Sequence, residues 1–488
     1  MKNEVAIYKI EKSEYPSPEE YFRPHKAYPE MEGLPVSSCS KRPNYVYDGV
    51  RNTLLMLGYD KENIGTKNWN PLRGLISPGQ SVVLKPNLVM HRNQNEAGKG
   101  RECLYTHPSV VAAVLDYVIL AMTDEAGIFS GSIVVGDAPL QSCDFERLVR
   151  ESGYARLICY YRKKGYAVQL KDFRNVRVAG DGWVYKKQGK DRQNGIVVSL
   201  GNRSNFSRLS PERMRRLRIT NYDPGILKKH HSRTVHEYRI ADEILKADAV
   251  INISKPKTHR KAGVTIAMKN LVGINANKEY LPHHTAGSWK SGKGDEYLHT
   301  NIFFSLAGFF LDWKNTAAQQ EHYMLARMIH FFAGFCNVTG RKFAKEPYRE
   351  GSWYGNDTIW RTIYDLNNII LFADRQGNIR DSIQRNVLHI ADMVIAGEGD
   401  GPLAPSAKEC GVIAAGENAA LFDECICALM GIDGQSIPSI RHLRDKGRLF
   451  FPAGQAEVAS NRQEWNTGEG QIKPVDSFQF EPNPGWMR

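Results

Sequence analysis

The chain has 488 residues, of which 42% are hydrophobic and 24% are charged, and its formal net charge is +12. These are ordinary values for a globular protein, and they exclude extensive disorder. The N-terminal residues lack the apolar stretch of a signal peptide, and the apolar run at 302–311 is too short to cross a bilayer. We therefore expect a compact cytoplasmic protein without a membrane span.

Eight cysteines are scattered over positions 39, 103, 143, 159, 336, 410, 425 and 427. None forms a CxxC pair, so their spacing supports neither a zinc ribbon nor an iron–sulfur cluster. Reduced thiols agree with a cytoplasmic location.

More than half of the net charge lies in residues 202–233, which hold nine Lys or Arg against Glu212 and Asp223. Such a positive field attracts phosphates, carboxylates, nucleic acid or anionic lipid, and a solvated basic face is an equally good interpretation. Since no motif that reads DNA or RNA accompanies the charge, nucleic acid is a less favoured partner.

Strand and helix patterns alternate along the first part of the chain. Apolar strands are expected at 81–84, 132–139, 195–200 and 249–254, and helices at 45–59, 107–122 and 240–247. This order predicts an α/β fold, with Rossmann-like βαβ units, a mostly parallel sheet and flanking helices.

The remaining segments complete or interrupt this fold. We expect an extended N-terminal arm at 1–45, an α/β core at 46–300 with a basic insertion near 185–235, a mainly helical insertion at 301–385, completion of the core at 386–450, and a C-terminal tail at 451–488. The aromatic helices expected at 301–340 are interpreted as core or as a subunit contact in a homodimer, rather than as a membrane anchor.

The segment DAVINISKPKTHRKAGVTIAMKNLVG, at 248–273, is the most informative. Its apolar strand delivers Lys255, Lys257 and His259 into an expected loop. In open α/β sheets, ligands bind at the carboxyl ends of the strands, so this segment predicts the floor of a site. Because His259 follows a strand and lies between lysines, we single it out from the seven histidines at 230–299 as an acid or base.

Next in the chain, Thr265 and Lys269 are four residues apart, and we expect them on one face of a helix. A lysine amid apolar neighbours needs either a core carboxylate or a ligand, and we favour an anionic ligand. Asn270 and Lys278 follow the same segment, and we expect them to bind substrate with it.

Other strand ends carry further candidates. Lys85 and Asn87 follow the strand at 81–84, and the proline between them stiffens the strand exit. Asp137 ends the next strand of this core. Thr106 and His107 either introduce a helix or contribute to the site.

A Gly-rich acidic loop is expected after the strand that begins near 387. It carries Asp392, Glu398 and Asp400, whose oxygens suit Mg²⁺ or Mn²⁺, and a tight solvated turn is an equally good interpretation. Neither a P-loop nor a GxGxxG fingerprint occurs in the chain.

Five segments resemble the domain-of-unknown-function family 362. They are VVLKPNLV at 82–89, THPSVVAAV at 106–114, IVVGDAP at 133–139, the stretch 247–274, and IADMVIAGEGDGPLAP at 390–405. Members of this family often carry ferredoxin-type cysteines beside the domain. This chain lacks them, so the resemblance implies no iron–sulfur cluster here.

A weaker similarity connects residues 257–273 with the lactate racemase family. It implies that His259 lines a nickel-pincer nucleotide and that Lys269 carries it.

Together these patterns favour a cytoplasmic enzyme that acts on a small anionic metabolite, phosphorylated or carboxylated, with the help of a divalent metal. We expect His259, Lys269 and Lys85 to be catalytic, and the substrate to be bound by Asn87, Thr106, His107, Asp137, Lys255, Lys257, Thr265, Asn270 and Lys278. Two alternatives remain open, namely a nickel-pincer racemase or epimerase, and a non-catalytic module that binds nucleic acid or an acidic partner through the Arg-rich segment.

Overall fold

The computed structural model describes residues 1–32, 34, 38–95, 100–180, 184–189, 193–344, 348–446, 455–467 and 472–487. A central sheet has the strand order β16-β1-β15-β14-β10-β2-β3-β4. The parallel part consists of β14 (Asn386–Asp400), β10 (Ala249–Ser254), β2 (Ser81–Pro86), β3 (Ser132–Asp137) and β4 (Val168–Asp172). The predicted α/β fold with a mostly parallel sheet is confirmed.

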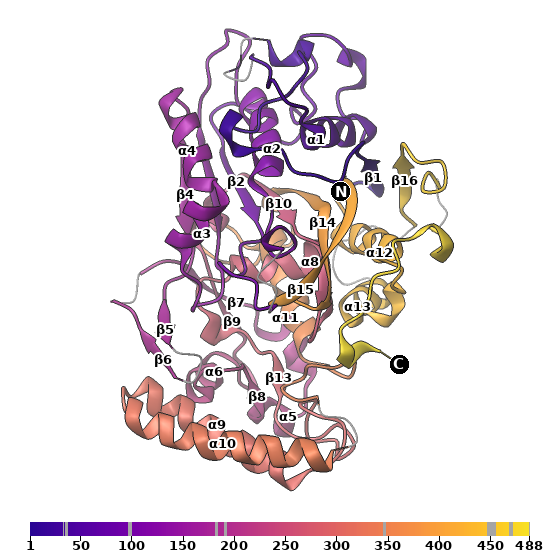
Figure 1. Ribbon diagram of the computed structural model, residues 1–488. Helices are drawn as coiled ribbons and strands as arrows, with labels where there is room; N and C mark the ends of the chain where they lie inside the picture. Colours follow the sequence, from indigo (N-terminus) through magenta and orange to yellow (C-terminus); the bar gives the residue numbers. More distant parts are fainter. Residues whose placement is uncertain are drawn as a thin grey trace.

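Helices cover both faces of this sheet (Figure 1). One face carries α1 (Tyr45–Met56), α2 (Pro108–Ala121), α3 (Phe145–Ser152) and α4 (Tyr154–Lys163), and the other carries α7 (Asp242–Lys246), α8 (Ala267–Asn270), α11 (Ile359–Phe372), α12 (Ala419–Met430) and α13 (Pro438–Lys446). Each face has its own hydrophobic core. Along β2, Val82 and Leu84 are buried in the core beneath α1–α4, whereas Val83 is buried in the core beneath α8 and α11. This alternation follows from the two-residue period of a strand and explains why β2 is apolar throughout.

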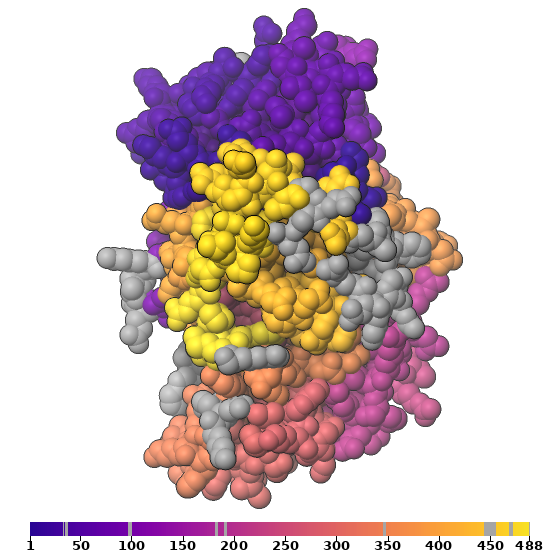
Figure 2. All heavy atoms as spheres, turned by 90° about the vertical axis from the view of Figure 1, so that its right-hand side faces the viewer, coloured from indigo at the N-terminus to yellow at the C-terminus, as the bar shows by residue number. Residues whose placement is uncertain are grey.

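The ends of the chain extend the sheet. Strand β15 (Ala404–Gly416) runs antiparallel to β14, and β1 (Glu4–Lys9) and β16 (Glu457–Ser460) follow it. The N-terminal segment is therefore not only an arm on the surface, because Val5, Ala6 and Ile7 are buried in the sheet. Figure 2 shows C-terminal residues, in yellow, spread over the surface between the N-terminal part and the opposite end. The predicted boundary at 450 lies outside the described residues.

The direction of the chain changes at the middle of the sheet. From β2 it proceeds through β3 to β4, whereas β10 and then β14 are added on the opposite side of β2. The carboxyl ends of β2 and β10 therefore flank a topological switch point, where α/β sheets commonly bind ligands.

The basic insertion lies outside the main sheet. It contains β6 (Tyr185–Lys187), β7 (Ile196–Ser199), α5 (Pro211–Arg215), β8 (Leu217–Arg218) and α6 (Pro224–His230). Its strands pair with strands outside the insertion, namely β6 with β5 (Val178–Gly180), β7 with β9 (Glu237–Ile240) and β8 with β13 (His284–Thr285). The strand expected at 195–200 exists but does not join the core. Several of its arginines are neutralised within the protein, such as Arg213 by Asp357 and Arg218 by Asp312.

The helical insertion forms a two-helix layer at one end of the molecule (Figure 1). Its helices are α9 (Ile302–Gln319) and α10 (Tyr323–Phe343), and they pack against each other. The interpretation of their aromatic residues as core is wrong for much of the layer, since Phe309, Phe331 and Phe343 are 63–75% exposed. The other interpretation, that these helices form a subunit contact in a homodimer, remains a prediction. Within the described ranges, every helix falls short of the length and apolarity needed to cross a membrane.

Candidate functional site

A cavity of about 850 Å³ lies where β2, β3 and β10 end. Its lining includes eight of the predicted site residues: Asn87, Asp137, Lys257, His259, Thr265, Lys269, Asn270 and Lys278. The β5–β6 hairpin and the inner side of α9 form other parts of the wall. A cavity of this volume suits a small metabolite.

The local structure of the central segment differs from the prediction. Instead of a loop, β11 (Lys257–His259) and β12 (Gly263–Thr265) form an antiparallel hairpin, which pairs Lys257 with Thr265. Instead of one long helix, α8 begins only at Ala267, so Thr265 and Lys269 do not share a helical face. Periodicity suggested a helix because short apolar stretches of strand and helix look alike in sequence.

Helix α8 is held at its start by a carboxylate from α12. The backbone N–H groups of Ala267 and Met268 donate to the Asp423 carboxylate at 2.8 and 3.1 Å. Burial raises the pKa of Asp423 to about 8 although both hydrogen bonds oppose it. Through this contact Asp423 positions the turn that carries Lys269.

Lys269 borders the cavity and makes no hydrogen bond or ion pair with any residue that the structure describes. Burial lowers its pKa to about 8, the positive charge of Lys85 lowers it further, and Asp137 acts in the opposite direction. A cation placed this way lacks a counter-ion until an anion enters the cavity.

A chain of amides connects the two strands at the switch point. Asn270 Nδ2 donates to Asn252 Oδ1 at 2.8 Å, and Asn87 Nδ2 donates to Asn270 Oδ1 at 2.8 Å. Lys257 Nζ in turn donates to Asn87 Oδ1 at 2.9 Å. Asn87 and Asn270 therefore serve mainly to orient Lys257 at the cavity wall.

The tautomer of His259 follows from its neighbours. Its Nδ1 accepts hydrogen bonds from the backbone N–H groups of Lys261 and Ala262, at 3.0 and 3.1 Å. The ring proton must therefore be on Nε2. Burial keeps the pKa of His259 well below its usual value, and Lys269 contributes to the same shift. Neutral His259 offers the cavity a hydrogen-bond donor. This role is more limited than the acid or base function expected from the sequence.

His283 also borders the cavity and has the opposite tautomer. Its Nδ1 lies 2.7 Å from the carbonyl oxygen of Leu281, which can only accept, so the lone pair is on Nε2. Burial lowers the pKa of His283 to about 3, with contributions from Lys261, Lys269 and Lys278. The site thus contains one imidazole donor and one imidazole acceptor.

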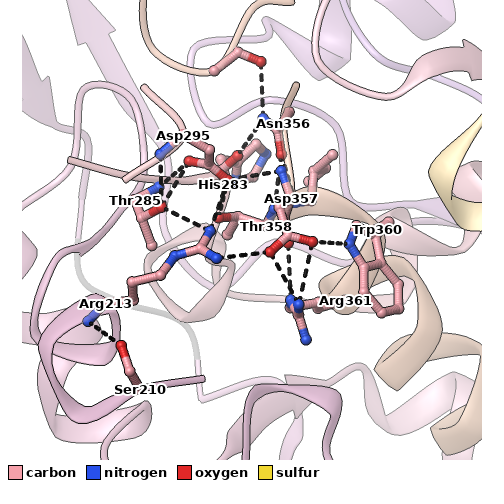
Figure 3. A network of polar contacts seen from close by, with 12 residues as sticks. Ser210, Arg213, His283, Thr285, Asp295, Asn356, Asp357, Thr358, Trp360 and Arg361 are labelled. Atoms are coloured by element: carbon pink, nitrogen blue, oxygen red, sulfur yellow. Dashed lines mark hydrogen bonds and ion pairs between the residues drawn. The ribbon is translucent and has the colours of Figure 1, made fainter. Parts of the chain in front are cut away.

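A polar network holds the backbone on both sides of His283 (Figure 3). Asn356 Nδ2 donates to the carbonyl oxygen of His283 at 3.0 Å, and Thr285 Oγ1 donates to Asp295 at 2.9 Å. Arg213 of the basic insertion approaches Asp295 at 3.8 Å. The insertion and the start of α11 therefore position a residue of the cavity.

Lys257, Lys261 and Lys278 also border the cavity and have no carboxylate in contact among the described residues, and the first and last of them were predicted. Burial is the largest cause of the lowered pKa of each, to about 7 for Lys257 and Lys278 and to about 8 for Lys261. Sequence reasoning missed Lys261 and His283, although both belong to the clusters of lysines and histidines from which Lys257 and His259 were selected.

Lys85 does not reach the cavity. Its side chain is fully buried, with Nζ 2.8 Å from Asp137 Oδ1. Gly273 covers this pair so closely that a Cβ there would lie 1.9 Å from Asp137 Oδ1. The structure therefore separates Lys85 from His259 and Lys269, and Lys85 acts on the site through Asp137 and through its charge.

Lys255 belongs to a second buried cluster. Its Nζ lies 2.8 Å from Asp392 Oδ2 and donates to the Tyr15 hydroxyl at 2.6 Å, and that hydroxyl donates to Asp392 Oδ1 at 2.6 Å. The ring of His107 stacks on Tyr15 with centroids 3.9 Å apart. These groups do not line the cavity, so the structure does not place Lys255 and His107 with the other candidates.

Thr106 is also absent from the cavity wall. Its hydroxyl donates to the carbonyl oxygen of Ile253 at 2.8 Å and accepts from the backbone N–H of Asn87 at 2.9 Å. Thr106 joins the ends of β2 and β10, whereas His107 is the N-cap of α2. Of the two interpretations given for these residues, the observed contacts agree with the structural one.

The three carboxylates proposed for a divalent metal do not converge. Asp392 is bound to Lys255, Glu398 pairs with Lys408 at 3.1 Å, and Asp400 accepts from Asn483. The expected loop is instead a continuation of β14 as far as Asp400, paired with β15. Within the described residues, no group of three or more His, Cys, Asp or Glu side chains has the arrangement of a metal site.

Comparisons with known proteins identify the family of the chain. The model of a family described as "Domain of unknown function (DUF362)" matches residues 82–188 and 203–428. The chain belongs to this family. A relative, a thylakoid-associated protein of Synechocystis sp., is 26% identical over 211 residues, which cover 43% of this chain and 44% of that protein. The chain thus spans less than half of this relative's length. No solved structure matches the chain.

Proposed function

We propose that the protein is an enzyme that binds a small phosphorylated or carboxylated metabolite in the cavity. The lining carries ten Lys or Arg against five Asp or Glu side chains, which favours an anion. The observation that carries the proposal is Lys269, which borders the cavity without a partner among the described residues. Lys257, Lys261 and Lys278 supply further positive charge.

The histidine tautomers and the lowered pKa of Lys269 support proton transfer as the chemistry. With a pKa of about 8, part of the Lys269 population is neutral near physiological pH and is able to accept a proton from the substrate. His259 Nε2–H would then donate to the oxygen on which negative charge develops. His283 Nε2 would accept a hydrogen bond from a substrate hydroxyl.

Ligand binding is tested by thermal unfolding with sulfate, phosphate and malonate as probes. We expect each effective anion to raise the unfolding temperature, and Lys269→Met to remove that rise. Lys163→Met is the matched control, since Lys163 is an exposed residue of α4 outside the cavity. If Lys269→Met and the parent protein respond equally, the proposal is wrong.

Catalysis is tested separately with a panel of phosphorylated and carboxylated metabolites in D₂O. Deuterium incorporation into one substrate, observed by NMR and lost in Lys269→Met, would support proton transfer by this lysine. Anion binding without exchange or turnover of any member of the panel would reject the enzymatic part and leave a binding protein.

A nickel-pincer racemase or epimerase is a second candidate, because His259 and Lys269 line the same cavity and the Lys269 amine contacts no partner in the described part of the chain. Lys269 would hold such a nucleotide covalently. Intact-mass measurement and elemental analysis of protein from its natural host would show the adduct and nickel, and the absence of both would remove this candidate.

A cytoplasmic location of the protein is likewise a proposal. The eight cysteines all lie in described segments and form no disulfide bond there, which supports a reducing compartment such as the cytoplasm. The name of the Synechocystis relative instead points to association with thylakoids. Fractionation of the natural host into soluble and membrane fractions would distinguish the two.

A further inference from the structure

The outward face of the α9–α10 hairpin is apolar along most of its length. On α9 the exposed large side chains are Ile302, Leu306, Phe309 and Trp313, with exposed fractions of 42–70%. Their spacing of four, three and four residues forms a single stripe along the helix.

Helix α10 continues this face with a second stripe. Met324, Met328, Phe331, Phe335 and Val338 are 57–83% exposed and follow the same helical spacing. A contiguous exposed apolar surface of this kind marks an interaction site in a folded protein.

Polar side chains make part of the contact between the hairpin and the rest of the protein, beside apolar contacts such as that of Phe304 with Tyr297. Asp312 accepts from Arg218 Nε at 2.9 Å, Asn315 Nδ2 donates to the carbonyl oxygen of Tyr222 at 3.1 Å, and Thr316 Oγ1 lies 3.1 Å from Asp223 Oδ1. An ordinary surface helix presents its polar side to water, whereas this hairpin presents large apolar side chains there although part of its inward contact is polar.

Basic residues border the apolar face. Arg327, Arg341 and Lys342 are exposed on α10, and Lys228 and Lys229 are exposed on α6, which packs against α9. Within residues 302–343, all of them described, Glu321 is the one exposed carboxylate, and it lies in the turn between the helices. Aromatic and aliphatic side chains with a basic border are typical of helices that bind anionic lipid surfaces.

We propose that the α9–α10 hairpin docks on the surface of an anionic bilayer. The apolar stripes enter the boundary between headgroups and acyl chains, and the basic side chains reach the lipid phosphates. A second copy of the chain fits less well, because a symmetric contact through this face would bring the same cations together, with Glu321 as the one exposed carboxylate of residues 302–343 to oppose them. The proposal is independent of what the cavity binds.

Flotation of the full chain with lipid vesicles tests this docking. We expect binding to phosphatidylcholine vesicles that contain about 30% phosphatidylglycerol, and weaker binding to pure phosphatidylcholine or at high salt. The double substitution Phe331→Ser/Phe335→Ser should weaken partitioning at least about tenfold, because it removes two large apolar side chains. Ile128→Ser is the matched control, since Ile128 is 62% exposed but lies away from the hairpin.

Two further measurements separate the possible occupants. Brominated acyl chains should quench part of the tryptophan fluorescence, and Trp313→Phe should remove that quenching. Size-exclusion chromatography with light scattering, without vesicles, should show a monomer. Absence of binding to anionic vesicles at low salt would overturn the proposal, and so would a dimer that Phe331→Ser/Phe335→Ser dissociates.

Discussion

Two sets of buried or half-buried lysines lie around the switch point of the sheet, and they differ in their counter-ions. Lys85 and Lys255 each have a carboxylate oxygen 2.8 Å away. Lys257 reaches only neutral acceptors, and Lys269 reaches none within the described residues. The charges of the first set are paired within the protein, whereas the second set has no carboxylate in contact among the described residues. Sequence proximity does not distinguish them, since Lys255 and Lys257 are two residues apart.

The largest expected effect is on stability, from breaking a completed pair. Lys255→Met leaves Asp392 buried without a cation, with the Tyr15 hydroxyl and the backbone N–H groups of His107 and Val394 as its remaining donors among the described residues. Loss of one partner of a buried ion pair costs about 3–5 kcal/mol, so we expect the free energy of unfolding in urea to fall by this amount. Lys163→Met, on the surface, should change it by less than about 0.5 kcal/mol. A small change in Lys255→Met would show that the pair is not a structural unit.

The second prediction concerns Lys269, whose replacement should leave the empty protein as stable as before. Lys269→Met removes a half-buried cation that has no counter-ion in the described structure, so the free energy of unfolding should stay within about 1 kcal/mol or increase. The same urea unfolding experiment measures it. A loss as large as that of Lys255→Met would place Lys269 with the structural lysines and would contradict the contrast drawn above.

The sequence indicated the segment that forms the site but not the partners of its side chains. Strand positions, the βαβ order and the convergence of Lys257, His259 and Lys269 could be predicted because each depends on local pattern or on the strand-end rule. The pairing of Lys255 with Asp392 could not, since the two residues are 137 positions apart in the sequence and only the register of β10 with β14 brings them together.

The role of the histidines was equally hidden in the sequence. His259 and His283 carry the same side chain, and their opposite tautomers arise from backbone groups, two N–H donors in one case and one carbonyl acceptor in the other. These groups become aligned only after the β11–β12 hairpin and the segment before β13 have folded. Residue type therefore predicts that imidazoles are present, and the backbone decides what each can do.

The third prediction is a pH dependence of anion binding. Sulfate keeps its charge over the working range, so any change reports on the protein. Lys257, Lys261, Lys269 and Lys278, with pKa values of about 7 to 8, are protonated below this range and lose their charge above it. Sulfate affinity should therefore fall by at least about tenfold as the pH rises from about 6 to about 9. Isothermal titration calorimetry in buffers of different ionisation enthalpy should show proton uptake on binding, and a constant affinity without uptake would reject these lysines as the anion site.

The smallest expected effect concerns Thr265, whose hydroxyl is buried at the cavity wall and has no hydrogen-bond partner in the described parts of the chain. Thr265→Val keeps the shape of the side chain and removes an unsatisfied polar atom, so the empty protein should gain up to about 1 kcal/mol in unfolding free energy. If the hydroxyl instead contacts the bound anion, sulfate affinity should fall by about threefold to tenfold in the same variant. Both quantities come from urea unfolding and calorimetry of one variant. A loss of stability with unchanged affinity would assign Thr265 to packing of the β11–β12 hairpin and would reject a contact with the anion.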